Sequence, residues 1–330
     1  MEIKQKKSFG QVMIQLRTLW ILIALALIFT ALKPLFMDPR NLLNMIKRMS
    51  YVAITAFGIT FVMTMGGLEM SGGSIACLVG VTLAIGLENG LPIGLMLPIV
   101  ILISIVCGLI NAVIIVEGNI APFLTTLATM NIYRGIAETI TEGRTIAIRV
   151  KGFTNFFGNG KLFDVIPLPV IITLVCFLIC WFLYSRTKLG FYCRCIGGNE
   201  EAARVAGINL RLVKYISYMF CALLAGIAGL ILAALMNAGV PEIGSDLSMD
   251  AISAAVLGGT AISGGIGSII GTVGGSFIMA ILNTGLALLG AQSNVQILAR
   301  GCVIIFAVLM DNALKKREAV QVVEAAKKKE

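Results

Sequence analysis

The sequence has no histidine among its 330 residues, and charged residues make up only 13% of it. Histidine is the commonest general base and the commonest metal ligand in proteins, and the imidazole-based catalytic triads depend on it. Its absence argues against an independent enzyme, so we expect no catalytic residue, no cofactor-binding residue and no metal site in this chain. Soluble domains are about one quarter charged, so the shortage of charge also argues against a soluble globular protein.

Apolar residues take the place of the missing charge. They form 58% of the chain, and the mean hydropathy is +0.95. A membrane-spanning helix needs about 20 apolar residues, so the roughly 190 apolar residues of this chain suffice for about eight to eleven crossings. The composition predicts an all-α, polytopic bundle of transmembrane helices in a lipid bilayer, and it excludes a receptor with a single anchor.

Apolar runs follow one another along the chain and predict about ten membrane segments. They cover residues 18–32, 42–65, 74–87, 92–116, 121–139, 165–184, 215–236, 249–262, 269–289 and 295–310. Basic residues concentrate before the first run, between the sixth and seventh runs and after the last run, and an even number of crossings puts these three places on one side. Because cytoplasmic segments are enriched in Lys and Arg, we expect both termini to be cytoplasmic. We expect the first run to remain as a helix rather than to be cleaved as a signal peptide.

The same pattern predicts one membrane domain with basic ends. The expected segments are a basic cytoplasmic N-terminus at 1–17, a transmembrane domain at 18–312, a cytoplasmic loop at 185–214, external loops at about 140–164 and 237–248, and a basic cytoplasmic tail at 313–330. No polar module is long enough to fold separately.

Glycine is abundant, with 36 residues, and glycine pairs recur at the ends of apolar runs. In lipid, glycine allows close helix packing, or a break whose freed backbone groups must face protein or water. The runs 74–87 and 249–262 hold only about 14 residues each, so either is a candidate for a broken or re-entrant helix. Gly267, Gly271 and Gly275 recur at every fourth position and predict a packing seam on one helix face.

The segment 66–74 places a carboxylate, Glu69, and the hydroxyls of Ser71 and Ser74 between two apolar runs. Ionisable residues at membrane depth are costly and usually functional, which makes Glu69 a candidate for a translocation pathway or its gate. The alternative is an interfacial turn in which Glu69 lies in water or caps the next helix. The sequence leaves both open.

Most of the eight cysteines lie inside apolar runs, where cysteine behaves as a small packing residue. Cys193 and Cys195 are expected to face water, but no second Cys or His pair lies near them, so a metal site is not expected. The net charge of +9 is explained by basic cytoplasmic segments. No basic stripe with interleaved aromatic residues indicates binding to nucleic acid.

The most specific local pattern lies in the polar stretch 185–214 and predicts a short capped helix. Its residues are Gly197, Gly198, Asn199, Glu200, Glu201, Ala202, Ala203, Arg204 and Gly207. Asn199 suits the N-cap, the two glutamates suit the positive N-terminal end of the helix dipole, and Gly207 suits a left-handed residue at its end. Two helical turns are not stable alone in water, so the membrane domain or a partner's groove must hold this helix.

The sequence contains no recognisable ATP-binding loop. Gly158, Gly160 and Lys161 superficially fit a P-loop, but Asn155 stands where the first glycine is needed and Leu162 where a hydroxyl binds Mg²⁺. Any work driven by ATP must therefore come from another subunit.

Several motifs, in one order, resemble the permease subunits of bacterial ABC importers for simple sugars, of the ribose, galactose and arabinose type. The likeness runs from about residue 41 to residue 311. The matching motifs lie at 66–74, 187–190, 197–208, 257–265, 267–272, 283–286 and 308–311. One departure is Glu69, where the family carries aspartate.

The resemblance implies ATP-driven import of ribose, galactose or a related monosaccharide across the bacterial cytoplasmic membrane. It implies a homodimer, an ATP-binding subunit with two ATPase domains that contacts the helix predicted at 197–207, and an extracytoplasmic binding protein that delivers the sugar. ATP is then bound by the partner subunit and not by this chain.

Hydroxyl and amide side chains at breaks or inside apolar runs suit a path for a neutral sugar. The candidates for this translocation path are Glu69, Ser71, Ser74, Asn111, Thr260, Ser263 and Asn283. The alternative function is an ion- or proton-coupled secondary carrier for a small polar solute, which also uses discontinuous helices. That function needs buried titratable groups, and the sequence offers few, such as Glu138 and Asp250 beside Glu69. A structural scaffold without transport leaves the capped cytoplasmic helix unexplained.

Overall fold

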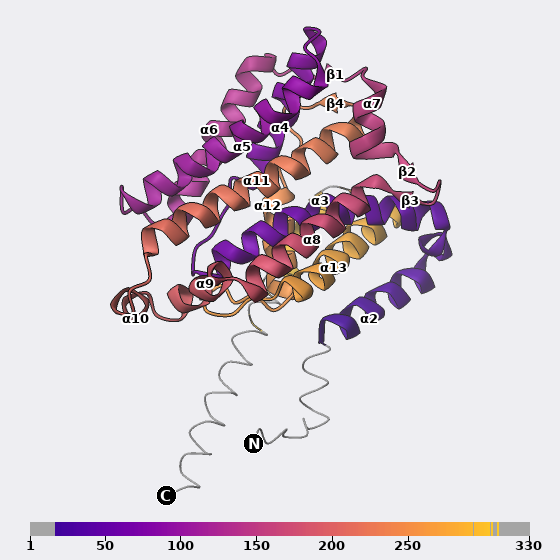
Figure 1. Ribbon diagram of the computed structural model, residues 1–330. Coiled ribbons are helices and arrows are strands. Elements are labelled where there is room, and N and C mark those ends of the chain that lie inside the picture. Colours follow the sequence, from indigo (N-terminus) through magenta and orange to yellow (C-terminus); the bar gives the residue numbers. More distant parts are fainter. Residues whose placement is uncertain (1–16, 293, 304, 306–308, 310–330) are drawn as a thin grey trace, which may run out of the picture.

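A computed structural model describes residues 17–292, 294–303, 305 and 309 (Figure 1). Its main helices are α2 (Arg17–Leu32), α3 (Pro39–Thr64), α4 (Gly72–Glu88), α5 (Ile93–Val116), α6 (Pro122–Thr141), α8 (Leu168–Arg186), α11 (Leu210–Met236), α12 (Leu247–Leu257) and α13 (Ile269–Leu288). Residues 294–303 are also helical. The basic tail expected at 313–330 and residues 1–16 of the expected N-terminal segment lie outside the described residues.

Short elements fill the connections between the long helices. They are η1 (Pro34–Met37), α7 (Lys151–Thr154), η2 (Asn155–Asn159), α9 (Lys188–Gly198), α10 (Glu200–Val205), β1 (Ile146–Ala147), β2 (Lys161–Leu162), β3 (Ile166–Pro167) and β4 (Ala238–Gly239). β1 pairs antiparallel with β4, with Ile146 opposite Gly239, and β2 pairs antiparallel with β3. The first pair joins the two connections that the sequence predicts to be external loops.

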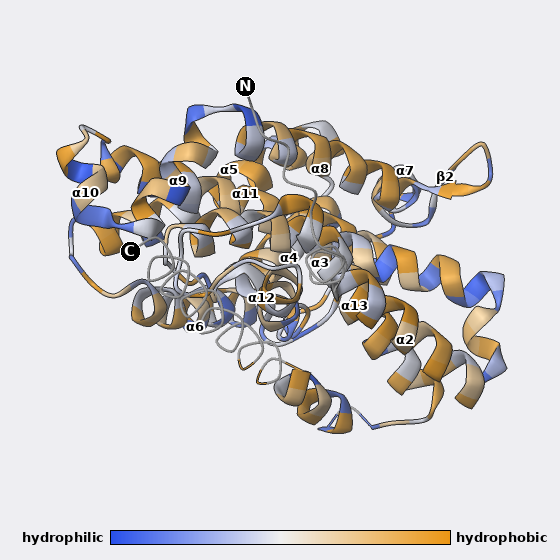
Figure 2. Cartoon of the chain, turned by 90° about the horizontal axis from the view of Figure 1, so that it is seen from below, coloured by the Kyte–Doolittle hydropathy of each residue, from blue (hydrophilic) through white to orange (hydrophobic). Residues whose placement is uncertain are grey.

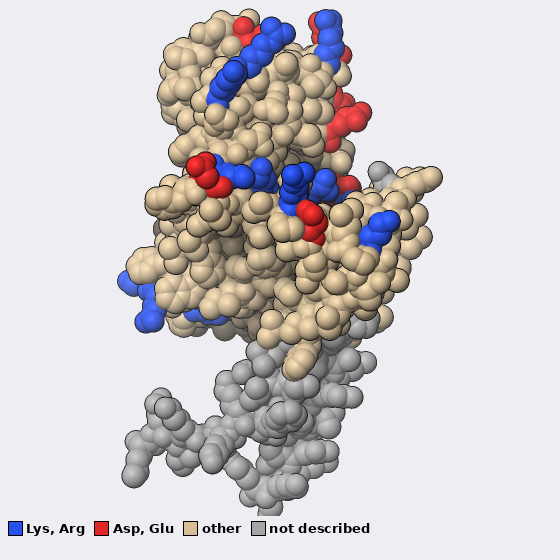
Figure 3. Space-filling view, turned by 90° about the vertical axis from the view of Figure 1, so that its right-hand side faces the viewer, with Lys and Arg blue, Asp and Glu red and all other residues tan. Residues whose placement is uncertain are grey.

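In the described part of the chain, five helices are long and apolar enough to cross a membrane: α3, α5, α8, α11 and α13. Most of the cartoon in Figure 2 has the hydrophobic colour, and large apolar side chains such as Leu174, Leu178 and Phe182 of α8 are exposed. Figure 3 shows charged side chains in a few groups separated by wide uncharged surface. Lipid, rather than water, suits an exterior of this kind. These five helices and the apolar exterior confirm the expected all-α membrane bundle. The count of ten segments and the side of the termini stay predictions.

Helices α3 and α11 form the centre of the bundle. α3 packs against α8, α11, α12 and α13, and α11 also packs against α4 and α5. The most apolar window of α3 is 78% buried, against 28% for α8 at the periphery. A Cβ added at Gly58 of α3 would lie 2.8 Å from the Cα of Cys221 on α11, so the absence of a side chain there lets the two helices approach.

Two of the apolar runs form helices that begin beside each other inside the bundle. α12 has 11 residues and is about 16 Å long, too short for a hydrocarbon core of about 30 Å. Its first turn meets the first turn of α4, where the Gly73 N–H donates to Ser248 Oγ at 2.8 Å. A Cβ at Gly73 would overlap the carbonyl of Gly244. Discontinuous helices whose N-termini meet at depth are a recurrent feature of transporters.

The connection before α12 is held by donors from other helices. Arg134 of α6 donates through Nη1 to the carbonyl oxygens of Pro241, at 2.6 Å, and Ile243, at 2.9 Å. The Cys77 thiol of α4 donates to the Pro241 carbonyl at 3.0 Å. Backbone groups freed by a break at membrane depth need such partners, because lipid offers none.

Two of the three positions predicted for a glycine seam, Gly271 and Gly275, lie on α13 and form it, whereas Gly267 precedes the helix and faces Thr64 and Tyr184 instead. A Cβ added at Gly271 would overlap the carbonyl oxygen of Gly258, the residue that caps the end of α12. A Cβ added at Gly275 would overlap the carbonyl oxygen of Ala254, in the last turn of α12. α12 and α13 therefore pack backbone to backbone along this face.

We expect Gly275→Ala to destabilise the protein by about 1–3 kcal/mol, because the added methyl group overfills this contact. Gly135 of α6 has no heavy atom within 4 Å of an added Cβ, so Gly135→Ala is the matched control and is expected to be neutral or stabilising. Thermal unfolding in detergent measures both. Equal melting temperatures for the two variants would contradict the packing argument.

Candidate functional site

A buried polar cluster lies where the α3–α4 connection meets α5 and α6. Glu69 Oε1 accepts hydrogen bonds from the Ser71 backbone N–H at 2.7 Å and from the Ser71 hydroxyl at 2.6 Å. Asn111 on α5 donates to Glu69 Oε2 at 3.0 Å and to Ser71 Oγ at 2.9 Å. Tyr133 on α6 donates to Asn111 Oδ1 at 3.0 Å. We call these four residues the Glu69 cluster.

Burial excludes the alternative in which Glu69 lies in water, but it does not exclude capping of the next helix, because Glu69 accepts from the N–H of Ser71, the N-cap residue of α4. The residue is 1% exposed, so it does not lie in water at an interfacial turn. Both carboxylate oxygens have donors, which offset the cost of burying a carboxyl group. The Glu69 cluster ties the α3–α4 connection to α5 and α6, so any movement of that connection has to break or carry these bonds.

The structure does not gather all the residues predicted for the path. Glu69, Ser71 and Asn111 belong to one cluster, whereas Asn283 of α13 donates to Asp250 of α12 at 3.0 Å. Ser74 and Thr260 are buried, and within the described residues neither hydroxyl has a hydrogen-bond partner. Ser263 is exposed on the connection between α12 and α13.

Sequence reasoning did not include Tyr133 among the candidates, although it closes the Glu69 cluster. A tyrosine in an apolar run carries a hydroxyl that needs a partner when it is buried, and that signal was present in the sequence. Asp246 was also omitted. It forms an ion pair with Arg300, which lies inside the last apolar run.

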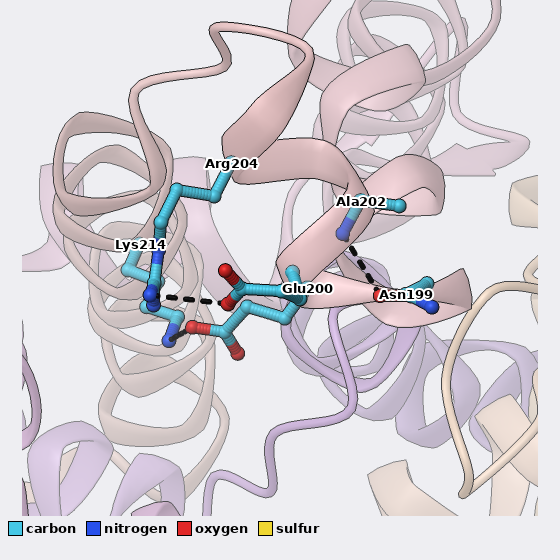
Figure 4. A network of polar contacts seen from close by, with 6 residues as sticks. Asn199, Glu200, Ala202, Arg204 and Lys214 are labelled. Carbon is cyan, nitrogen blue, oxygen red and sulfur yellow. Dashed lines mark hydrogen bonds and ion pairs between the residues drawn. The ribbon is translucent and has the colours of Figure 1, made fainter.

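The predicted short helix is present as α10, with the expected cap (Figure 4). Asn199 Oδ1 accepts from the Ala202 N–H at 2.9 Å, and Gly207 is left-handed, with φ of 81°. Glu200 binds Lys214 of α11 at 2.7 Å, which ties α10 to the bundle. Gly197 and Gly198 differ from expectation, because they form the end of the longer helix α9.

The outer face of α10 carries a pair of charges. Arg204 Nη1 lies 3.1 Å from Glu201 Oε2, and the side chains of Glu201 and Arg204 are 71% and 61% exposed. Ala203, between them in sequence, is buried against the bundle. The helix therefore presents charge outward while one small residue anchors it.

Glycines of three segments meet just before α10: Gly197 in the last turn of α9, Gly66 after the end of α3, and Gly264 and Gly265 in the α12–α13 connection. The Gly265 N–H donates to the carbonyl of Thr64, the last residue of α3, at 2.9 Å. A Cβ at Gly197 would overlap the same carbonyl, and a Cβ at Gly264 would lie 2.9 Å from both the Gly197 oxygen and the Gly66 nitrogen. We call this contact the glycine junction. It connects α9, the end of α3 and the α12–α13 connection through backbone atoms, so these segments cannot move independently.

Two adjoining cavities lie between α10, the start of α11 and the α5–α6 connection. The larger, of about 450 Å³, is lined by Asn119, Glu200, Arg204, Arg211 and Lys214 among others. The smaller, of about 240 Å³, extends to Gly67 and Tyr218. The Tyr218 hydroxyl is buried without a hydrogen-bond partner in the part of the chain that the structure describes. The smaller cavity is lined directly by Met65, Gly66 and Gly67 of the α3–α4 connection.

Comparison with known proteins agrees with this architecture. Residues 41–308 match the family described as "Branched-chain amino acid transport system / permease component". The chain belongs to this permease family. The ribose import permease protein RbsC of Bacillus subtilis is 38% identical over 313 residues, which cover 94% of this chain and 97% of that protein. RbsC of Haemophilus influenzae is 36% identical over 93% of this chain and 96% of that protein.

A more distant relative is also named as an import permease. The autoinducer 2 import system permease protein LsrD of Photorhabdus laumondii is 32% identical over 88% of each chain. No solved structure matches. The protein is thus a multi-pass inner-membrane permease, a transport subunit rather than an enzyme. The resemblance found in the sequence is confirmed, and membership in the family displaces the secondary carrier and the scaffold as interpretations.

One expectation about the cysteines of the permease is wrong. Cys193 does not face water: it is fully buried, with its Sγ 3.6 Å from Ser217 Oγ. Burial raises the pKa of the Cys193 thiol to about 11, so it is protonated at neutral pH. A metal requires the thiolate, so the pair Cys193 and Cys195 is poorly suited to hold one.

We expect Asn111→Leu to destabilise the permease by about 1–3 kcal/mol, because it leaves Oε2 of the buried Glu69 side chain without a donor. Asn131→Leu is the control: Asn131 is exposed on α6 and bonds only its own helix. Thermal unfolding of the purified protein measures the difference. If Asn111→Leu and Asn131→Leu have the same melting temperature, the Glu69 cluster does not hold the α3–α4 connection.

Proposed function

We propose that this permease is the membrane subunit of an ATP-driven importer that moves a simple sugar, ribose or a related monosaccharide, into the cell. The observation that carries the proposal is the identity of 36–38% with ribose import permeases over 90–94% of the chain. Permeases named for galactofuranose and xylose transport are also similar, at 32% and 29% identity. The family description names branched-chain amino acids, so an amino acid is the substrate to test against.

The proposed partner on the cytoplasmic face is an ATP-binding subunit with two ATPase domains, which docks on α10. Two features support this. The sequence carries no phosphate-binding loop of its own, and α10 presents the exposed pair Glu201 and Arg204. The glycine junction supplies a physical link, because a displacement of α9 and α10 is transmitted by backbone contact to the end of α3. The other proposed partners are an extracytoplasmic sugar-binding protein and a second copy of this chain.

The proposed topology has ten membrane segments, both termini in the cytoplasm, a membrane domain at 18–312, and basic cytoplasmic segments at 1–17 and 313–330. The shortness of α12 supports a segment completed by the turns of residues 258–268 that follow it. The charged surface of α10 and the basic residues of 185–214 favour a cytoplasmic position for that loop. The pairing of β1 with β4 is consistent with one external layer formed by the loops at 140–164 and 237–248.

In the proposed cycle, ATP binding closes the partner domains, α10 moves with them, and the glycine junction carries the movement to α3 and the α12–α13 connection. The path is proposed to be lined by Glu69, Ser71, Ser74, Asn111, Thr260, Ser263 and Asn283. Tight binding is left to the extracytoplasmic protein. A path of hydroxyls and amides then needs only weak, transient contacts with a neutral sugar.

We expect the charge swap Glu201→Arg with Arg204→Glu to reduce sugar-stimulated ATP hydrolysis by about tenfold or more, because it sets like charges against the partner's surface. The two residues remain able to pair with each other, so the fold of α10 is expected to be kept. The assay uses the permease in proteoliposomes with its ATPase subunit and its ribose-loaded binding protein.

The matched control is Glu142→Arg with Arg144→Glu, a second exposed ion pair at the other end of α6 from the α5–α6 connection. It is expected to leave hydrolysis unchanged. The proposed function fails if ribose-loaded binding protein does not stimulate hydrolysis by the wild type, or if leucine replaces ribose as the stimulating solute. Equal activity of the two charge swaps overturns only the docking role of α10.

A further inference from the structure

A second polar cluster, formed by Asp246, Asp250, Asn283 and Arg300, joins the start of α12 to α13 and to the helix of residues 294–303. Arg300 Nη1 lies 2.7 Å from Asp246 Oδ2, and Asn283 Nδ2 donates to Asp250 Oδ2 at 3.0 Å. Arg300 Nε lies 3.5 Å from Asp250 Oδ1, which is too long for a good hydrogen bond. We call these residues the Arg300 cluster. Two carboxylates and one guanidinium give it a net charge of −1.

The Arg300 cluster has buried hydrogen-bonding capacity that the described residues do not fill. Asp250 Oδ1, Asn283 Oδ1 and Arg300 Nε are all buried without a hydrogen-bond partner there. Native proteins rarely leave even one such atom without a reason, because a buried polar atom has lost its hydrogen bonds to water. Asp250 is only 7% exposed, yet the neighbouring Asp246 side chain is 49% exposed, so the cluster is deep but has an open side.

Charge selects the class of molecule that would complete these bonds. The guanidinium of Arg300 disfavours a cation, and the two carboxylates disfavour an anion. Arg300 Nε and Asp250 Oδ1 face each other across 3.5 Å, so one hydroxyl can accept from Arg300 and donate to Asp250, and a second hydroxyl can donate to Asn283 Oδ1. Neighbouring hydroxyls on one small molecule fit this pattern, and such a molecule is a neutral sugar.

The position of the Arg300 cluster supports the same assignment. Ser248, which accepts from the Gly73 N–H at the meeting of α4 and α12, lies between Asp246 and Asp250 in the sequence. Substrate sites of transporters form at such discontinuous helices. Resting on the proposed function, we infer that the Arg300 cluster is a sugar-recognition subsite of the translocation path, in which Asp250, Asn283 and Arg300 bind adjacent hydroxyls of the passing sugar and Asp246 orients the guanidinium.

The test compares uptake of ribose and of xylose, two pentoses that differ in the orientation of one hydroxyl, in proteoliposomes containing the complete importer at saturating loaded binding protein. We expect Asn283→Ala to lower ribose uptake about 2- to 10-fold, the effect of one lost hydrogen bond, and to change the ratio of the ribose rate to the xylose rate. ATP hydrolysis per importer is expected to fall less than uptake, because the step that is impaired is transfer of the sugar. Asp246→Asn is expected to change the same ratio.

Two controls separate this role from a structural one. Asp164→Asn and Asn131→Ala change exposed residues of the same types and are expected to leave both the rates and the ratio unchanged. Thermal unfolding and the oligomeric state are measured for each variant. An unchanged sugar ratio, with uptake, hydrolysis and melting temperature all reduced together, assigns the Arg300 cluster to folding and overturns the inference.

Other outcomes are equally decisive. If Asn283→Ala dissociates the permease into monomers, the free atoms of the Arg300 cluster face a second copy, and the inference fails. If the wild type moves ribose and the variants match Asp164→Asn, the inference fails while the proposed function stands. If the wild type moves leucine but neither sugar, the proposed function fails first.

Discussion

The structure depends on one constraint: backbone groups freed by a break in a membrane helix must find partners inside the protein, because lipid supplies none. At the start of α4 the freed N–H of Gly73 donates to Ser248, and before α12 the carbonyls of Pro241 and Ile243 accept from Arg134. Each of these bonds joins segments far apart in the sequence. The partners of these freed groups therefore join α4 and α6 to α12 and to the connection before it, and they place polar atoms where a polar solute can use them.

The glycine junction applies the same principle at the base of α10. Thr64, Gly197 and Gly265 meet through backbone atoms, with no room for a side chain at Gly197. Side chains can rotate to absorb a displacement, whereas backbone atoms in contact transmit it. A six-residue helix with little stability of its own is in this way attached to α3, one of the two central helices. The Glu69 cluster begins only a few residues beyond that contact.

Two polar clusters of the membrane domain differ in how many of their buried polar atoms have hydrogen-bond partners. In the Glu69 cluster both carboxylate oxygens and the Asn111 amide are bonded, so a sugar that passes it meets side chains that already have partners and is bound only weakly. In the Arg300 cluster three buried atoms lack partners among the described residues, which suits a place where another molecule completes the bonds. The two clusters contain similar polar groups, and they are distinguished by whether those groups already have hydrogen-bond partners.

The sequence by itself determined the class of the protein. Hydrophobic runs predicted an all-α membrane protein, the missing histidines argued against an enzyme, and the resemblance of the ordered motifs to sugar-importer permeases predicted its family. Local spacing predicted α10 with its cap at Asn199. These features depend on neighbours within about four residues or on total composition, and both can be read along a chain. The seam of Gly271 and Gly275 was predictable for the same reason.

Only the tertiary structure decided which polar residues meet. Glu69 and Asn111 are 42 positions apart, Asp250 and Asn283 are 33 apart, and no local pattern relates them. The burial of Cys193 was equally out of reach, because α9 has polar and apolar faces and the packing of the bundle determines which one is covered. Contacts across long separations follow from helix packing in three dimensions, so the residues of a site were individually visible in the sequence while their partners were not.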